Sequence, residues 1–181
     1  VLAIAEAGYA GDSHFAIGVW RYSQDQDDLF AVDGFGNPLQ RSAQGVYALA
    51  ERRIAGEPDG PRTVTGFLRA GISDGRTTPF RGGGQAGVLV ERVVPGRENS
   101  QLSFGVNVGL LGRAFRNATE AGGTPTTGAE TQLELTYADQ IGPYLQVQPD
   151  LQYTFNPGGV AGADGALVAT LRFTLSYGMQ D

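Results

Sequence analysis

The sequence lacks cysteine, has a single histidine and contains no long apolar run. Without cysteine it can form neither disulfides nor thiolate metal sites, and His14 alone does not make a typical metal site. No stretch approaches the roughly 20 apolar residues of a transmembrane helix. Basic residues are also few, with 13 Lys and Arg against 19 Asp and Glu and a net charge of -6. We therefore expect no nucleic-acid partner, no metal and no cofactor.

What the sequence does contain is strict alternation of apolar and polar residues. In the segment 129–139, Leu133 and Leu135 alternate with Glu134 and polar neighbours. The segments 144–155 and 165–177 continue the same pattern. Successive side chains of a strand point to opposite faces, so each of these strands is apolar on one face and polar on the other. A soluble sheet also has such faces, so the pattern alone leaves the solvent undecided.

Nine strand-like segments can be placed along the 181 residues. They lie at about 1–10, 14–23, 44–54, 63–72, 84–92, 101–111, 129–139, 144–155 and 165–177. Longer connections fall on one side and shorter ones on the other, as in transmembrane barrels. Only a closed barrel lets strands span hydrocarbon with every backbone group satisfied. We therefore predict an all-β, antiparallel transmembrane β-barrel with about nine strands in this chain.

The polar faces of these strands hold charged side chains that we predict to line a water-filled lumen. This set comprises Glu6, Glu51, Arg69, Glu91, Glu134, Asp150 and Arg172, and Gln148 is assigned to the same faces. The alternative is the solvated face of a soluble sheet. We expect the aromatic residues near strand ends on the apolar faces to form a membrane-interface girdle. They are Tyr137, Tyr153, Phe155 and Tyr177. The aromatics on the polar faces could contact sugar rings or belong to the girdle, and they are Trp20, Tyr22, Tyr47 and Phe67.

Catalytic motifs are weak. The string Gly82–Gly87 satisfies G-x-G-x-x-G, but strand-like residues 88–90 follow it where a dinucleotide site requires a helix. The sequence contains no nucleophile elbow and no Ser/His/Asp set. We therefore predict that the protein is not an enzyme.

The segments Pro149–Tyr153 and Asn156–Gly159 carry a resemblance to a known family. Together with Glu134–Tyr137 and Pro95–Arg97, they resemble the carbohydrate-selective porin family OprB. Weaker similarity extends over almost the whole chain. It corresponds to the C-terminal half of a typical member, and this agrees with an odd strand count and a start inside a strand. We therefore expect residues 1–181 to be one porin barrel domain, the C-terminal half of a longer chain.

The resemblance implies a 16-stranded, usually trimeric barrel in the outer membrane of a Gram-negative bacterium, through which sugars diffuse passively. It implies no cofactor and no reaction. It also points to Glu91, Arg97, Glu134, Asp150 and Gln152 as polar lining. The full predicted pore-lining set is Glu51, Arg69, Glu91, Arg97, Glu134, Gln148, Asp150, Gln152 and Arg172. Two alternatives stay open here: a small plugged outer-membrane barrel with a structural or adhesion role, and a soluble carbohydrate-binding β-sandwich.

Overall fold

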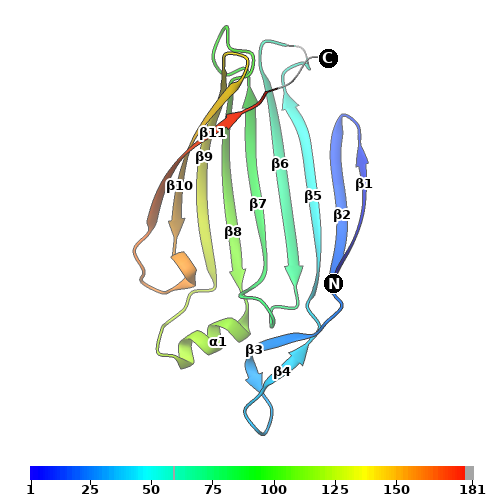
Figure 1. Ribbon diagram of the computed structural model, residues 1–181, viewed down its shortest axis with the longest axis vertical. Helices are drawn as coiled ribbons and strands as arrows, with labels where there is room; N and C mark the ends of the chain where they lie inside the picture. The colour runs from blue at the N-terminus through cyan, green and yellow to red at the C-terminus, as the bar shows by residue number, and fades with distance from the viewer. Residues whose placement is uncertain (59, 178–181) are drawn as a thin grey trace.

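One curved antiparallel sheet of nine strands dominates the computed structural model, which describes residues 1–58 and 60–177 (Figure 1). Its strands pair in the order β1-β2-β5-β6-β7-β8-β9-β10-β11, so each strand lies beside its neighbour in sequence apart from one inserted hairpin. The bounds are β1 Leu2–Ala10, β2 Ser13–Tyr22, β5 Gln44–Ala55, β6 Thr63–Ser73, β7 Phe80–Glu91, β8 Gln101–Leu111, β9 Ala129–Ile141, β10 Leu145–Phe155 and β11 Ala166–Leu175. The predicted nine-stranded antiparallel arrangement is confirmed.

The strands have 9 to 13 residues, which suits the roughly 9–11 residues with which a tilted strand crosses hydrocarbon. Among the described residues, β1 pairs only with β2, and β11 pairs only with β10. The sheet is therefore an open, curved wall with two unpaired edges. The described part of the chain contains no helix long and apolar enough to cross a bilayer.

Three of the connections between the strands of the large sheet contain secondary structure that the alternation of apolar and polar residues did not predict. The segment between β2 and β5 forms a hairpin of β3 (Gln26–Val32) and β4 (Pro38–Arg41). The segment between β8 and β9 contains helix α1 (Arg113–Ala121), which begins after Gly112 and ends at Gly122. A short 3-10 turn, η1 (Pro157–Gly159), follows β10. Hairpin, helix and turn all lie at the same end of the sheet (Figure 1), which we call the loop end.

The predicted start of the fifth strand is wrong, and so is the long connection predicted between the fourth segment (63–72) and the fifth (84–92). Strand β7 begins at Phe80, four residues before the expected start at 84. Gly82, Gly83 and Gly84 have no side chains to alternate, yet they pair with β6 and β8. A Cβ on Gly83 would lie 2.5 Å from the carbonyl oxygen of Val108, so the neighbouring backbone needs glycine there. The β6–β7 connection is consequently short although it lies at the loop end.

The sheet has almost no dry interior. The buried apolar residues of the described chain are Ala16, Ala43, Leu111, Ala114 and Ala138, of which only leucine is large. Most large apolar side chains instead stand exposed on one face, for example Ile17 at 66%, Leu171 at 55% and Phe173 at 60%. No second sheet packs face to face on the nine-stranded sheet within residues 1–58 and 60–177. The described residues therefore do not form the sandwich considered above, and an exposed apolar face of this extent is typical of a surface that contacts membrane or protein.

Candidate functional site: the polar face of the sheet

Strand register places the predicted polar residues on one face. Arg69 lies opposite Gln85, Gln85 opposite Asn107, and Asn107 opposite Gln132. Residues paired across neighbouring strands point to the same face of a sheet. The polar side chains of consecutive strands therefore form a continuous row, which we call the polar row.

The polar row is joined by hydrogen bonds on β8, β9 and β10. The Asn107 amide donates to Gln132 Oε1 at 3.3 Å, and the Gln132 amide donates to Gln152 Oε1 at 2.9 Å. Gln152 in turn donates to Asp150 Oδ1 at 2.8 Å, while the Thr136 hydroxyl donates to Asp150 Oδ2 at 2.6 Å. The side chains therefore support one another in a fixed arrangement, and their remaining donors and acceptors can bind a polar solute.

The row continues on β6 and β7 around Arg69. Its Nη1 donates to Gln85 Oε1 at 3.2 Å, and its guanidinium carbon lies 5.4 Å from the centre of the Phe67 ring. A flat apolar ring beside a planar cation is a surface that suits both the apolar face and the hydroxyls of a sugar.

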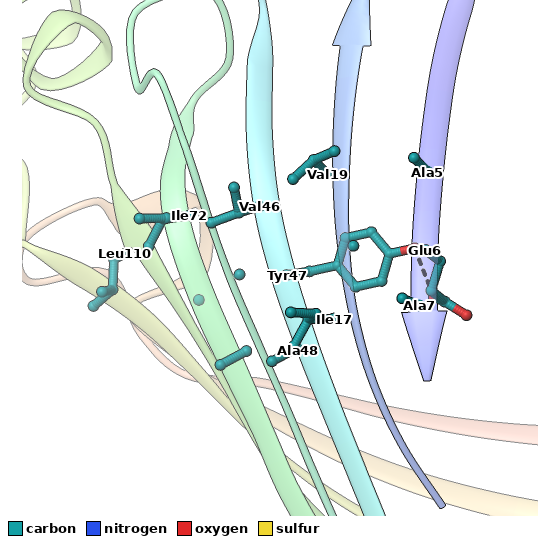
Figure 2. Close-up of a pocket in the computed structure, with 14 residues that line it drawn as sticks. Ala5, Glu6, Ala7, Ile17, Val19, Val46, Tyr47, Ala48, Ile72 and Leu110 are labelled. Carbon is teal, nitrogen blue, oxygen red and sulfur yellow. Dashed lines mark hydrogen bonds between the residues drawn. The ribbon is translucent and has the colours of Figure 1, made fainter. Parts of the chain in front are cut away.

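Tyr47 and Glu6 extend the polar face to the first strands. Tyr47 reaches from β5 across Gly18 of β2, and its hydroxyl donates to Glu6 Oε2 on β1 at 2.7 Å (Figure 2). Gly18 leaves room for this crossing, because a Cβ there would collide with the Tyr47 ring and displace it. Sequence reasoning noted both polar side chains but could not pair them, since their contact depends on the register of three strands.

The predicted pore-lining residues divide into five groups by position. Arg69, Glu134, Asp150 and Gln152 belong to the polar row. Gln148 and Arg172 face each other across β10 and β11, and Glu51 lies beside His14. Glu91 contacts the Thr63 hydroxyl at the strand end away from the loop end. Arg97 lies in none of the strands.

Arg97 is held in the β7–β8 connection, where its Nε lies 2.8 Å from Asp139 Oδ2. The Tyr137 hydroxyl donates to the same carboxylate oxygen at 2.8 Å. Asp139 and Tyr137 alternate along β9 with the polar-face residues, so they lie on the same face as Leu135, which is the apolar face. Arg97 therefore does not join the polar row, and its motif builds a turn that anchors the end of β9.

Sequence reasoning left out Gln85, Asn107, Gln132 and Thr136, which complete the polar row. The sequence did indicate their face, because each of them alternates with apolar or small residues along its strand. Gln85 was obscured because it lies inside the glycine-rich string. The Asn156–Gly159 motif is also structural: Asn156 has a left-handed φ of 49°, and the Gly158 amide donates to Glu130 Oε2 at 2.5 Å.

The opposite face is mainly apolar, with charged residues such as Arg21, Arg52 and Asp139 near strand ends. A hollow of about 680 Å³ beside β1, β2, β5 and β6 is lined mostly by small or branched apolar residues, including Ala7, Ile17, Val19 and Val46, together with Glu6 and Tyr47 of the polar face (Figure 2). Aromatic pairs stand near the strand ends of this face, with Tyr9 and Phe15 stacked at 5.5 Å and Tyr153 and Phe155 at 4.7 Å between ring centres. An apolar band between aromatic residues, with polar groups on the other face, is typical of the wall of an outer-membrane barrel.

A single curved antiparallel sheet with one polar and one apolar face is the architecture of a β-barrel wall of the porin class. Residues 1–177 match the family described as "Carbohydrate-selective porin, OprB family". The chain therefore belongs to the OprB porin family, whose fold is that of a channel and not of an enzyme.

A solved structure with the same fold is "High pH structure of Pseudomonas putida OprB". It aligns with a TM-score of 0.81 and 22% sequence identity over 97% of this chain. The alignment covers 48% of that protein, so the present chain spans about half its length. No curated protein sequence matches this chain.

Proposed function

We propose that the protein forms part of an outer-membrane channel through which carbohydrates and other small solutes diffuse down their gradients. The observation that carries this proposal is the polar row with an apolar face behind it. Family membership supports the substrate class, and the fold shared with a protein of about twice the length supports a larger barrel. In this proposal further strands pair with β1 and β11 to complete a 16-stranded wall.

The chemistry of the polar row suits neutral, hydroxyl-rich solutes. Amides such as Gln132 and Gln152 both donate and accept, as sugar hydroxyls do. Carboxylates such as Asp150 accept strongly, and the Arg69 guanidinium donates. These groups can replace part of a sugar's hydration while it passes, which lowers the free-energy barrier to permeation without a chemical step.

Liposome swelling tests the proposal with the full-length protein. Vesicles containing the channel should swell in an isotonic monosaccharide solution, whereas protein-free vesicles should not. The informative variant is Gln85→Leu, which removes the acceptor of Arg69, and the matched control is Ala86→Leu on the apolar face of the same strand. We expect a changed swelling rate for Gln85→Leu and the wild-type rate for the control. Absence of sugar-dependent swelling in the wild type would overturn the proposal.

Localisation and assembly extend the same proposal. We place the protein in the outer membrane of a Gram-negative bacterium, with lipid against the apolar face. The homotrimer implied by the family resemblance stays a prediction. Membrane fractionation tests the location, and light scattering of the detergent-solubilised protein tests the trimer. A mass equal to one protomer plus detergent would refute the trimer alone.

A further inference from the structure

A second polar site lies at the loop end, apart from the polar row. A cavity of about 290 Å³ opens where the β3–β4 hairpin, the β6–β7 connection and the start of α1 meet. Its lining includes Phe30, Arg76, Arg81, Arg113 and Asn117. The volume lies just below the range typical for drug-sized ligands, so it suits a monosaccharide.

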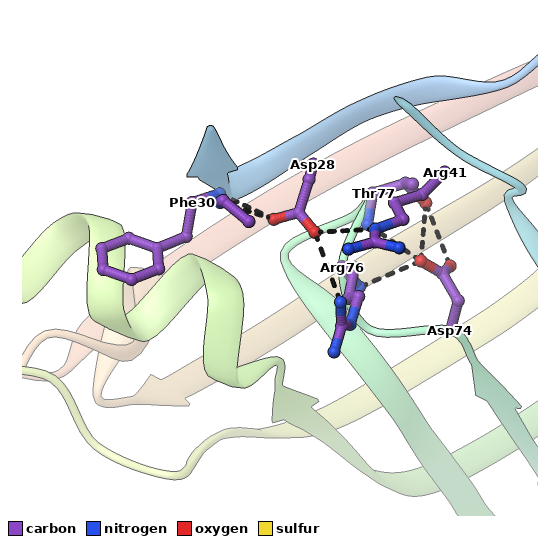
Figure 3. A network of polar contacts seen from close by, with 7 residues as sticks. Asp28, Phe30, Arg41, Asp74, Arg76 and Thr77 are labelled. Atoms are coloured by element: carbon purple, nitrogen blue, oxygen red, sulfur yellow. Dashed lines mark hydrogen bonds and ion pairs between the residues drawn. The ribbon is translucent and has the colours of Figure 1, made fainter. Parts of the chain in front are cut away.

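The acidic side chains of this cavity are already committed to the protein. Asp28 Oδ1 accepts from the backbone amides of Phe30 and Ala31 at 3.0 and 2.9 Å. Its Oδ2 lies 3.4 Å from Arg41 Nε and 3.8 Å from Arg76 Nη1 (Figure 3). Because this carboxylate is buried and fully partnered, it joins the hairpin to the β6–β7 connection and is not available to a ligand.

Asp74 is committed in the same way. Its Oδ2 accepts from the backbone amides of Arg76 and Thr77, each at 3.0 Å, and the Thr77 hydroxyl donates to Oδ1 at 3.0 Å (Figure 3). Both carboxylates of the cavity therefore stabilise the loops that form it. The charge that the protein itself leaves unneutralised at this site is positive.

Arg81 and Arg113 supply that positive charge. Within the described residues, neither guanidinium forms an ion pair or a side-chain hydrogen bond. Asn117 lies one helical turn after Arg113 and presents an amide to the same side of α1. An excess of cationic donors at one point of a chain with net charge -6 indicates an anionic ligand.

Phe30 adds the second element of recognition. Its backbone amide donates to the Asp28 carboxylate, its ring extends away from that carboxylate on the side of α1, and the residue is 48% exposed (Figure 3). A flat ring with free surface can cover the apolar face of a pyranose. The cavity thus combines a surface for a sugar ring with two guanidinia and an amide for an attached anionic group.

We infer that this cavity binds a monosaccharide that carries a carboxylate or phosphate, and that it concentrates acidic sugars at the loop end before permeation. The inference rests on the proposed channel function and narrows its substrate class. The same anionic sugar chemistry occurs on soluble sugar acids and on lipopolysaccharide headgroups. We assign the cavity to the soluble solute, since the available volume fits one sugar.

Titration of the detergent-solubilised full-length protein with glucuronate, and separately with glucose, tests the inference. We expect glucuronate to bind the wild type, and the double variant Arg81→Gln/Arg113→Gln to bind it at least about tenfold more weakly, because two charge-assisted hydrogen bonds are lost. The matched control Arg21→Gln/Arg52→Gln changes net charge equally on the apolar face of β2 and β5 and should bind like the wild type. Circular dichroism confirms that both variants are folded.

The outcomes separate this inference from the proposed function. Equal glucuronate affinity in wild type and double variant overturns the cavity assignment, even if liposomes still swell in glucose. Binding of lipopolysaccharide by the wild type, together with no binding of glucuronate, overturns the assignment to a soluble sugar. Failure of liposome swelling with any sugar, while glucuronate binding depends on the two arginines, overturns the channel function and leaves the binding site standing.

Discussion

Substituting Leu171 or its neighbour Thr170 by arginine tests the assignment of the two faces at a single depth. The two residues are adjacent near the middle of β11, so they lie within about 3.3 Å along the strand. Leu171 is on the apolar face, where its side chain is 55% exposed. Thr170 is on the polar face and lies opposite Asp150. The pair therefore varies the face while holding depth and introduced charge constant.

Leu171→Arg should destabilise the membrane-inserted protein by roughly 2–4 kcal/mol, the cost of arginine near the bilayer midplane. This corresponds to a roughly 30- to 800-fold change in the folding equilibrium constant. Thr170→Arg should have little effect, because its charge would enter water beside the Asp150 carboxylate. The physical reason for the contrast is that only Leu171 would face hydrocarbon in the proposed membrane setting.

Equilibrium unfolding of the full-length protein in lipid vesicles measures both effects. Guanidinium titration followed by tryptophan fluorescence gives the free energy of unfolding for the wild type and each variant. Equal destabilisation by the two substitutions would refute the face assignment. Greater destabilisation by Thr170→Arg would reverse it, and Leu171 would then face water.

Three further perturbations test the parts of the structure that surround the channel face. Gly18→Ala should change single-channel conductance in planar bilayers, because the new methyl group displaces the Tyr47 ring across the polar face. Arg97→Ala should lower the free energy of unfolding by about 1–3 kcal/mol, since it removes the charged partner of a carboxylate that is only 5% exposed; an unchanged denaturation midpoint would contradict this. The third perturbation is a change of pH at Asp28. Burial by itself raises the pKa of this carboxyl group. Hydrogen bonds from Ala31, Phe30 and Arg41 and the charge of Arg76 outweigh burial and hold the pKa below its ordinary 3.8. The hairpin should therefore resist acid-active proteases above pH 3.8 and lose that resistance as pH falls through the lowered pKa, whereas Asp28→Asn should lack the pH dependence.

Strand positions could be predicted because alternation is a local property of the sequence. Leu133 and Leu135 reveal the face of β9 without knowledge of any partner strand, and the nine segments follow from such patterns. Glycines 82–84 carry no side-chain signal, so the start of β7 was misplaced. Helix α1 was missed because it is a short element within a long connection and its stability depends on packing against β3.

The side-chain contacts of the site could be predicted only in part. Parity places Asp150 and Gln152 on the polar face, but their hydrogen bonds to Thr136 and Gln132 depend on the register between β9 and β10. Arg97 was included through motif resemblance, and motif resemblance does not distinguish a lining residue from one that fixes a turn.

If the protein lies in the outer membrane as proposed, the unpaired margins of β1 and β11 constrain how it can enter the bilayer. Each backbone amide or carbonyl left without a partner in hydrocarbon costs several kcal/mol, and both margins present such groups along a full strand. Insertion strand by strand would incur that cost at every step. In the proposed outer-membrane setting, the wall therefore has to acquire partner strands at both margins as it crosses the membrane, which would couple membrane entry to strand pairing in one cooperative event.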